Sequence, residues 1–149
     1  QGRGCEGALG QGATADRSSP VQIPGTTWKQ VSSGQASMSV AAVKTDGTLW
    51  VWGNNDEGKL GLNNTTQYNS PVQVPGTTWD YVRFQRNAYA VKTDGTLWSW
   101  GTANGQGQLG LNNETEYSSP VQVGSETDWT GDKVMGSQEN GTPIFIRKS

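Results

Sequence analysis

The stretch that decides the fold is Lys44-Thr45-Asp46-Gly47-Thr48-Leu49-Trp50-Val51-Trp52-Gly53, and it returns almost unchanged at residues 92–101. An Asp-Gly pair between two apolar runs is typical of a two-residue type I′ hairpin, whose central residues both need positive φ. We therefore expect two β-hairpins, with turns at Asp46-Gly47 and Asp94-Gly95.

Each expected turn also predicts which residues of the two strands face each other. Small residues opposite large ones are a common packing unit of sheets, so the tryptophans of both hairpins are expected in the core. The expected pairs are Val43 with Trp50, Ala41 with Trp52, Val91 with Trp98, and Tyr89 with Trp100.

The composition limits the kinds of protein this chain can be. Its 149 residues suffice for one domain, but only 32% are apolar and 21 are glycine, so the core must be built from few, large side chains such as the seven tryptophans. The net charge of −2 comes from scattered charges without a basic stripe, which argues against nucleic acid as a ligand. The apolar runs are too short to span a membrane, and the lone Cys5 excludes an internal disulfide.

The repeat extends well beyond the hairpin. Trp28 recurs 51 residues later as Trp79 and 50 residues after that as Trp129. Each period contains a Gly-rich loop, a Ser-Pro-Val-Gln strand, a further turn and strand, and the hairpin. Four short strands in about fifty residues, without helical periodicity, indicate an all-β protein built from four-stranded antiparallel β-propeller blades. We expect one domain over 1–149, with repeat segments of approximately 1–39, 40–87 and 88–149.

The repeat resembles that of the regulator of chromosome condensation family. The resemblance implies a seven-bladed propeller, usually non-enzymatic, that binds other proteins through its flat faces and their loops. The chain departs from the family pattern where family repeats typically carry a Gly-x-x-His step, because this chain has no histidine. The residues that carry the resemblance are Asp46, Gly47, Trp50, Trp52, Gly53, Asn55, Gly58, Leu60 and Gly61.

About three blades form an open arc and cannot close a ring. An open arc leaves unpaired strand edges and an exposed flank of its core, which propellers normally avoid by radial repetition. We therefore expect the partners to be other protein chains or further copies of this one that complete the propeller, unless a longer parent chain supplies the missing blades.

Residue types needed for common catalytic sites are missing. Without histidine, Ser-His-Asp and Cys-His arrangements and Cys/His zinc sites cannot be built. The carboxylates of Asp46 and Asp94 are explained by their turns, which leaves Asp56, Glu57 and a Glu114/Glu116 pair as weak acid/base candidates. We therefore predict no enzymatic activity, no cofactor and no metal.

Two repeated loops carry candidate glycan contacts. Asparagine amides beside an aromatic ring can hydrogen-bond a sugar and stack on it, and loops on a rigid scaffold often carry binding. The alternative is that these asparagines recur because they adopt left-handed turns at little cost. The candidates are Asn63, Asn64 and Tyr68 in one loop, and Asn112, Asn113 and Tyr117 in the other.

The segment Arg83-Phe84-Gln85-Arg86 interrupts the repeat and is the local candidate for a partner contact. Arginine and aromatic side chains are enriched at interface hot spots, so Arg83, Phe84 and Arg86 are the candidate residues. The alternative, which we favour, is a shortened connector with Phe84 in the core and both arginines in solvent.

These observations predict a non-catalytic structural or protein-interaction module, such as an adhesive surface or virion component located outside the cell. Three alternatives remain open. They are a lectin-like carbohydrate-binding propeller, a guanine-nucleotide exchange or chromatin regulator of the family it resembles, and a proteinaceous enzyme inhibitor.

Overall fold

The computed structural model describes residues 7–34, 38–131, 134–135 and 144–145. Cys5 lies outside these residues. The described strands form three antiparallel sheets, so the predicted all-β class is confirmed. The first sheet has the order β1 (Trp28–Gly34), β2 (Ser39–Lys44), β3 (Leu49–Gly53) and β4 (Tyr68–Val74).

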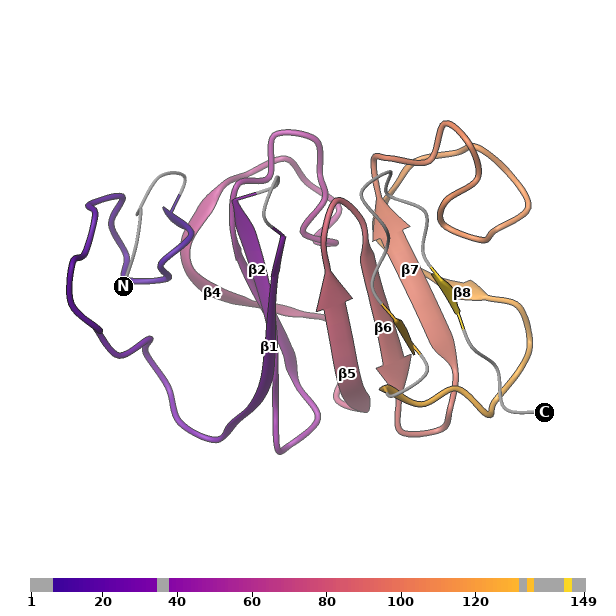
Figure 1. Cartoon of the computed structure of the whole chain (residues 1–149), viewed down its shortest axis with the longest axis horizontal. Coiled ribbons are helices and arrows are strands. Elements are labelled where there is room, and N and C mark those ends of the chain that lie inside the picture. Colours follow the sequence, from indigo (N-terminus) through magenta and orange to yellow (C-terminus); the bar gives the residue numbers. More distant parts are fainter. Residues whose placement is uncertain (1–6, 35–37, 132–133, 136–143, 146–149) are drawn as a thin grey trace.

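The second sheet repeats this meander with β5 (Trp79–Phe84), β6 (Ala88–Lys92), β7 (Leu97–Gly101) and β8 (Tyr117–Val123). A third sheet pairs β9 (Val134–Met135) with β10 (Ile144–Phe145). The two four-stranded sheets lie side by side, with their long loops at one end and their tight hairpin turns at the other (Figure 1). We call β1–β4 the first blade and β5–β8 the second blade.

Both predicted hairpins form, but the predicted turn type is wrong. Gly47 has φ 83°, whereas Asp46 is not among the residues with positive φ. The Gly47 N–H donates to the Lys44 carbonyl (3.1 Å) and the Lys44 N–H donates to the Thr48 carbonyl (2.9 Å). This is a three-residue loop made of a type I turn followed by a left-handed glycine, and the second hairpin has the same bonds around Gly95.

The extra loop residue shifts the strand register by one residue, so the predicted facing pairs are also wrong. Each tryptophan still faces a small side chain, because both strands present alanine or valine at the neighbouring position. The observed pairs are Val43 with Leu49, Ala42 with Trp50, Ala41 with Val51, Val40 with Trp52, Val91 with Leu97, Ala90 with Trp98, Tyr89 with Ser99, and Ala88 with Trp100.

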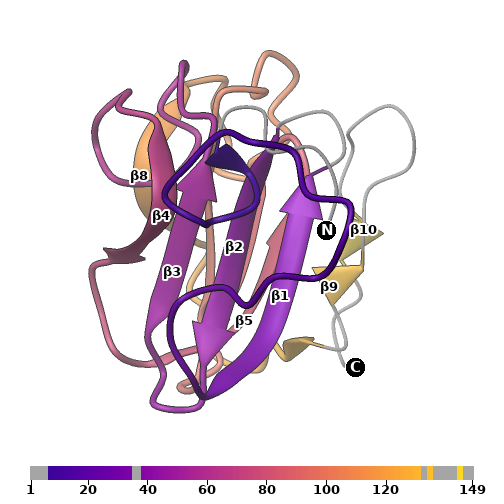
Figure 2. The same ribbon diagram turned by 90° about the vertical axis from the view of Figure 1, so that its left-hand side faces the viewer.

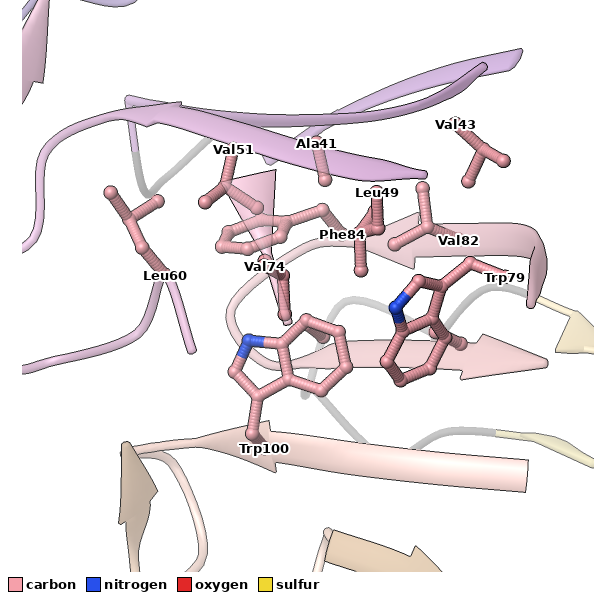
Figure 3. Close-up of a cluster of buried hydrophobic side chains, with 12 residues drawn as sticks. Ala41, Val43, Leu49, Val51, Leu60, Val74, Trp79, Val82, Phe84 and Trp100 are labelled. Carbon is pink, nitrogen blue, oxygen red and sulfur yellow. The ribbon is translucent and has the colours of Figure 1, made fainter. Parts of the chain in front are cut away.

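The main core lies between the two blades. Leu49, Val51 and Val74 of the first blade pack against Val82 and other side chains of the second, all of them fully buried (Figure 3). The second blade adds the large buried side chains of Phe84, Trp79 and Trp100 to this core. Trp52, which corresponds to Trp100 in the repeat, packs on the other side of the first blade, where segment 7–27 crosses the sheet (Figure 2).

The inner strands β1 and β5 are joined by side chains and not by a ladder. The Gln30 amide donates to the Val82 carbonyl (2.7 Å) and accepts from the Val82 N–H (3.0 Å). The Ser32 hydroxyl accepts from the Phe84 N–H (2.9 Å) in the same way, and Lys29 forms an ion pair with Asp80. The two blades are therefore held in a defined register by bonds that only neighbouring blades can make.

Candidate functional site

A groove of about 390 Å³ lies between the outer strand of the first blade and the flank of the second. We call it the interblade groove. Strand β4 and the loop before it supply Tyr68, Asn63 and Asn64, while β6 and β7 supply Lys92 and Trp98. The groove thus brings three of the six predicted glycan contacts together with two residues that were not predicted to act with them. The other residues that line it are Gly61, Leu62, Gln73, Pro75, Trp79, Ser119 and Pro120.

Lys92 is held over two tryptophan rings. Its ammonium nitrogen lies 4.0 Å from the ring centre of Trp98 and 4.9 Å from that of Trp79. The two rings meet edge to face, with centroids 6.1 Å apart. A cation over the face of tryptophan is attracted by the negative face of the ring system, which keeps this ammonium group at the groove. In the first blade Lys44 lies in the same way over Trp28 and Trp50.

The hairpin turn orients Trp98. The Asp94 carboxylate accepts hydrogen bonds from the Thr96 hydroxyl (2.7 Å) and the Thr96 N–H (3.0 Å). The Thr96 hydroxyl oxygen in turn accepts from the Trp98 indole N–H (2.9 Å). The hydrogen bond from the Thr96 hydroxyl, followed by that from its N–H, lowers the pKa of Asp94.

The first blade repeats this chain of hydrogen bonds from Asp46 through Thr48 to Trp50, and the pKa of Asp46 is lowered for the same reason. Because the same turn both closes the hairpin and bonds an indole, the turn chemistry and the placement of each tryptophan are coupled.

The asparagines of the repeated loops are occupied by their own loops. The Asn64 amide nitrogen donates to the Leu62 carbonyl (3.3 Å) and the Tyr68 hydroxyl (3.2 Å), and its oxygen accepts from the Thr66 N–H (3.0 Å). Asn63 has φ 54°, the left-handed conformation that the alternative reading expects of a turn asparagine.

The second loop repeats these features without joining the interblade groove. The Asn113 amide donates to the Leu111 carbonyl (3.1 Å) and the Tyr117 hydroxyl (3.3 Å), and Asn112 has φ 56°. The two candidate glycan clusters are therefore separate, one on each blade.

Asn55 and Asn104 are structural residues whose role the sequence did not reveal. Both are completely buried. The Asn55 amide donates to the Asn64 (2.9 Å) and Thr66 (3.0 Å) carbonyls and accepts from the Leu60 N–H (2.9 Å). Asn104 makes the corresponding bonds in the second blade. Their recurrence at the start of each Gly-rich loop was the available signal.

The segment that interrupts the repeat divides between core and surface. Phe84 is completely buried in the core between the blades, so its ring is not offered to a partner. Arg86 is exposed in the turn between β5 and β6, and Arg83 is half-buried on β5. The buried location of Phe84 agrees with the interpretation of this segment as a shortened connector.

The carboxylate candidates lie at the loop end of the blades. Glu57 and Glu116 line one shallow hollow of about 510 Å³, and the Thr102 hydroxyl donates to Glu57 (2.8 Å). Within the residues described above, no group of three or more His, Cys, Asp or Glu side chains lies in a position to hold a metal ion. The same part of the chain contains no helix long and apolar enough to cross a membrane.

The comparisons with known proteins identify the repeat. The model of the "Regulator of chromosome condensation (RCC1) repeat" matches residues 46–82 and 94–134. The chain belongs to the RCC1 repeat family. Both matched segments begin at the Asp-Gly turn of a hairpin. The first ends within β5 of the second blade and the second ends at the start of β9, so the sequence repeat is out of phase with the sheets.

Relatives with RCC1 repeats are much longer proteins. The chain is 41% identical over 73 residues to the mouse X-linked retinitis pigmentosa GTPase regulator, covering 46% of this chain and 7% of that protein. It is 32% identical over 76 residues to the human E3 ubiquitin-protein ligase HERC2, covering 49% of this chain and 2% of that protein.

Solved structures share the fold. Human WBSCR16 aligns with a TM-score of 0.70 and 25% identity over 82% of this chain and 32% of its own. Prp20p of Saccharomyces cerevisiae aligns with a TM-score of 0.58 and 18% identity over 75% of this chain and 28% of its own. The expected propeller architecture is thereby confirmed, with this chain forming a partial propeller. RCC1-like propeller repeats form a protein-interaction module, and the comparisons give no sign of a virion or surface role.

Proposed function

We propose that this chain is a non-catalytic protein-interaction module that acts as an arc of an RCC1-type propeller, with further blades packed against its β1 side. The observation that carries the proposal is a difference between two equivalent valines. Val82 is completely buried, whereas Val31 is 62% exposed.

The two valines occupy the same place in their blades. Val31 pairs with Ala42 of the second strand, and Val82 pairs with Ala90. Val82 is covered because the first blade lies against it and Gln30 bonds its backbone. A strand that packed beside β1 as β1 packs beside β5 would cover Val31 in the same manner. Such a strand would bury apolar surface, and this burial would stabilise the contact by about 25 cal/mol per Å².

The test is the mass and melting of the 149-residue chain in solution. The proposal is supported if the wild-type chain assembles with copies of itself and Val31→Asp dissociates the assembly. It is also supported if the chain is a monomer that melts broadly and binds a hydrophobic dye, because both results show an arc that needs neighbouring blades. Val21→Asp is the matched control, since Val21 is 45% exposed but lies in the segment before β1. A sharply melting monomer of 15.9 kDa would refute the proposal, as would assembly unaffected by Val31→Asp.

A second candidate is regulation of a small GTPase. It is supported by the 41% identity to a protein named as a GTPase regulator and by the shared fold with Prp20p, which binds Gsp1p and histones. The net charge of −2 without a basic stripe argues against direct DNA contact by these residues. Acceleration of fluorescent-nucleotide release from a small GTPase by the chain would support exchange activity, and an unchanged release rate would exclude it for the GTPase tested.

A further inference from the structure

We propose that the interblade groove is a docking site for an acidic peptide segment, in which an apolar or aromatic side chain enters the groove and a neighbouring carboxylate pairs with Lys92. The inference rests on the proposed function as an interaction module and names the chemistry of one partner.

The groove has the size and lining for one large apolar side chain. Its volume of about 390 Å³ falls at the small end of the range of ligand pockets. The Tyr68 and Trp98 rings come from different blades, and Pro75 and Pro120 add apolar surface on the two sides. Aromatic and proline surfaces that line one groove favour the binding of an aromatic ring or an aliphatic side chain.

The charge of the groove favours a peptide in which an acidic residue stands next to that apolar side chain. Lys92 is the only charged residue among those that line the groove. The carboxylate of nearby Asp94 is already bonded to the Thr96 hydroxyl and N–H, which lower its pKa, and the charge of Lys92 contributes to that lowering. The rings of Trp79 and Trp98 hold its ammonium group in place, which reduces the entropy lost when a carboxylate binds it.

The Asn64 side chain does not favour a neutral sugar in the groove. A sugar needs amide groups that are open to its hydroxyls, but the Asn64 amide already bonds within its own loop. The Asn63 oxygen accepts from the Ser118 hydroxyl of the second blade (3.3 Å). An ammonium group next to apolar rings matches an acidic peptide better than a neutral carbohydrate.

The experiment titrates the ¹⁵N-labelled 149-residue chain with two tetrapeptides and follows the indole N–H signals of its seven tryptophans. One peptide is acetyl-Gly-Phe-Glu-Gly-amide, the other carries Gln in place of Glu, and maltotriose is the sugar probe. We expect the acidic peptide to shift the Trp79 and Trp98 signals and to bind about two- to fivefold more tightly than the Gln peptide, as an exposed ion pair allows. That preference should shrink in 0.5 M salt.

Matched variants assign the effect to one lysine. Lys92→Met should abolish the preference for the acidic peptide, whereas Lys44→Met removes an equivalent lysine over two tryptophans of the first blade and should leave the preference intact. Equal binding of both peptides to the wild type, loss of the preference only in Lys44→Met, or shifts caused by maltotriose instead would overturn the proposal. If Lys92→Met does not fold, the salt dependence of the wild type still decides.

A negative result for peptide binding at the groove can be distinguished from a negative result for the proposed function. Val31→Asp tests packing at the β1 flank and leaves the interblade groove unchanged, because Val31 does not line it. An arc that assembles through β1 but ignores both peptides would keep the proposed function and remove this docking site.

Discussion

Replacing Gly47 by alanine should destabilise the chain far more than its position in an exposed turn suggests. Gly47 has φ 83°, and a Cβ added there would lie 2.2 Å from the Thr77 carbonyl oxygen. The Gly47 carbonyl also accepts the Trp79 N–H (2.9 Å), which ties the turn of the first blade to the start of β5. The substitution therefore strains the turn and pushes apart two segments that connect the blades.

The magnitude follows from three contributions. A left-handed non-glycine residue costs about 1–2 kcal/mol. Displacing the 75–78 loop weakens one hydrogen bond worth about 0.5–1.5 kcal/mol, and forced repacking costs about 1–3 kcal/mol. The reduced freedom of the unfolded chain offsets about 0.4–1 kcal/mol of this. We expect a net loss of about 2–5 kcal/mol.

Urea unfolding followed by tryptophan fluorescence measures this loss. Gly107→Ala is the matched control, because Gly107 has φ 71° but the nearest atom to an added Cβ is 3.8 Å away. The control should lose only the conformational cost, about 1 kcal/mol. Equal losses for the two variants would show that the contact between the turn and the Thr77 loop contributes nothing, and the reasoning would be refuted.

Two further predictions concern the turns and the loops. The double variant Asp46→Asn, Asp94→Asn should be less stable than the wild type at neutral pH, and the difference in stability should vanish as the pH falls below 3.8. The reason is that each carboxylate has a lowered pKa in the folded state and loses its stabilising contribution on protonation. Melting temperatures from pH 7 to pH 2 check this, and a difference independent of pH would contradict it. Asn55→Ala should lower the free energy of unfolding in urea by about 2–4 kcal/mol, because it leaves the buried Leu60 N–H without a partner. The control Thr65→Ala, at an exposed position, should leave that free energy almost unchanged. Similar decreases for both variants would show that Asn55 does not hold its loop.

The repeated Asp-Gly stretch alone determined the hairpins and, through its recurrence, the blades. Turn chemistry acts between residues a few positions apart, so a sequence displays it directly. The type of turn was beyond this reasoning. The Asp46 side chain bonds Thr48, and the loop gains one residue, which shifts every strand pair by one.

Only the tertiary structure decided what lies between the blades. The Gln30 bonds to Val82 join residues 52 positions apart, and the interblade groove combines Tyr68 of one blade with Lys92 and Trp98 of the next. A repeat shows that blades exist, but contacts between blades depend on how two sheets pack face to face. That packing is set by the summed shape of many buried side chains, Phe84 among them, and no local pattern in the sequence contains it.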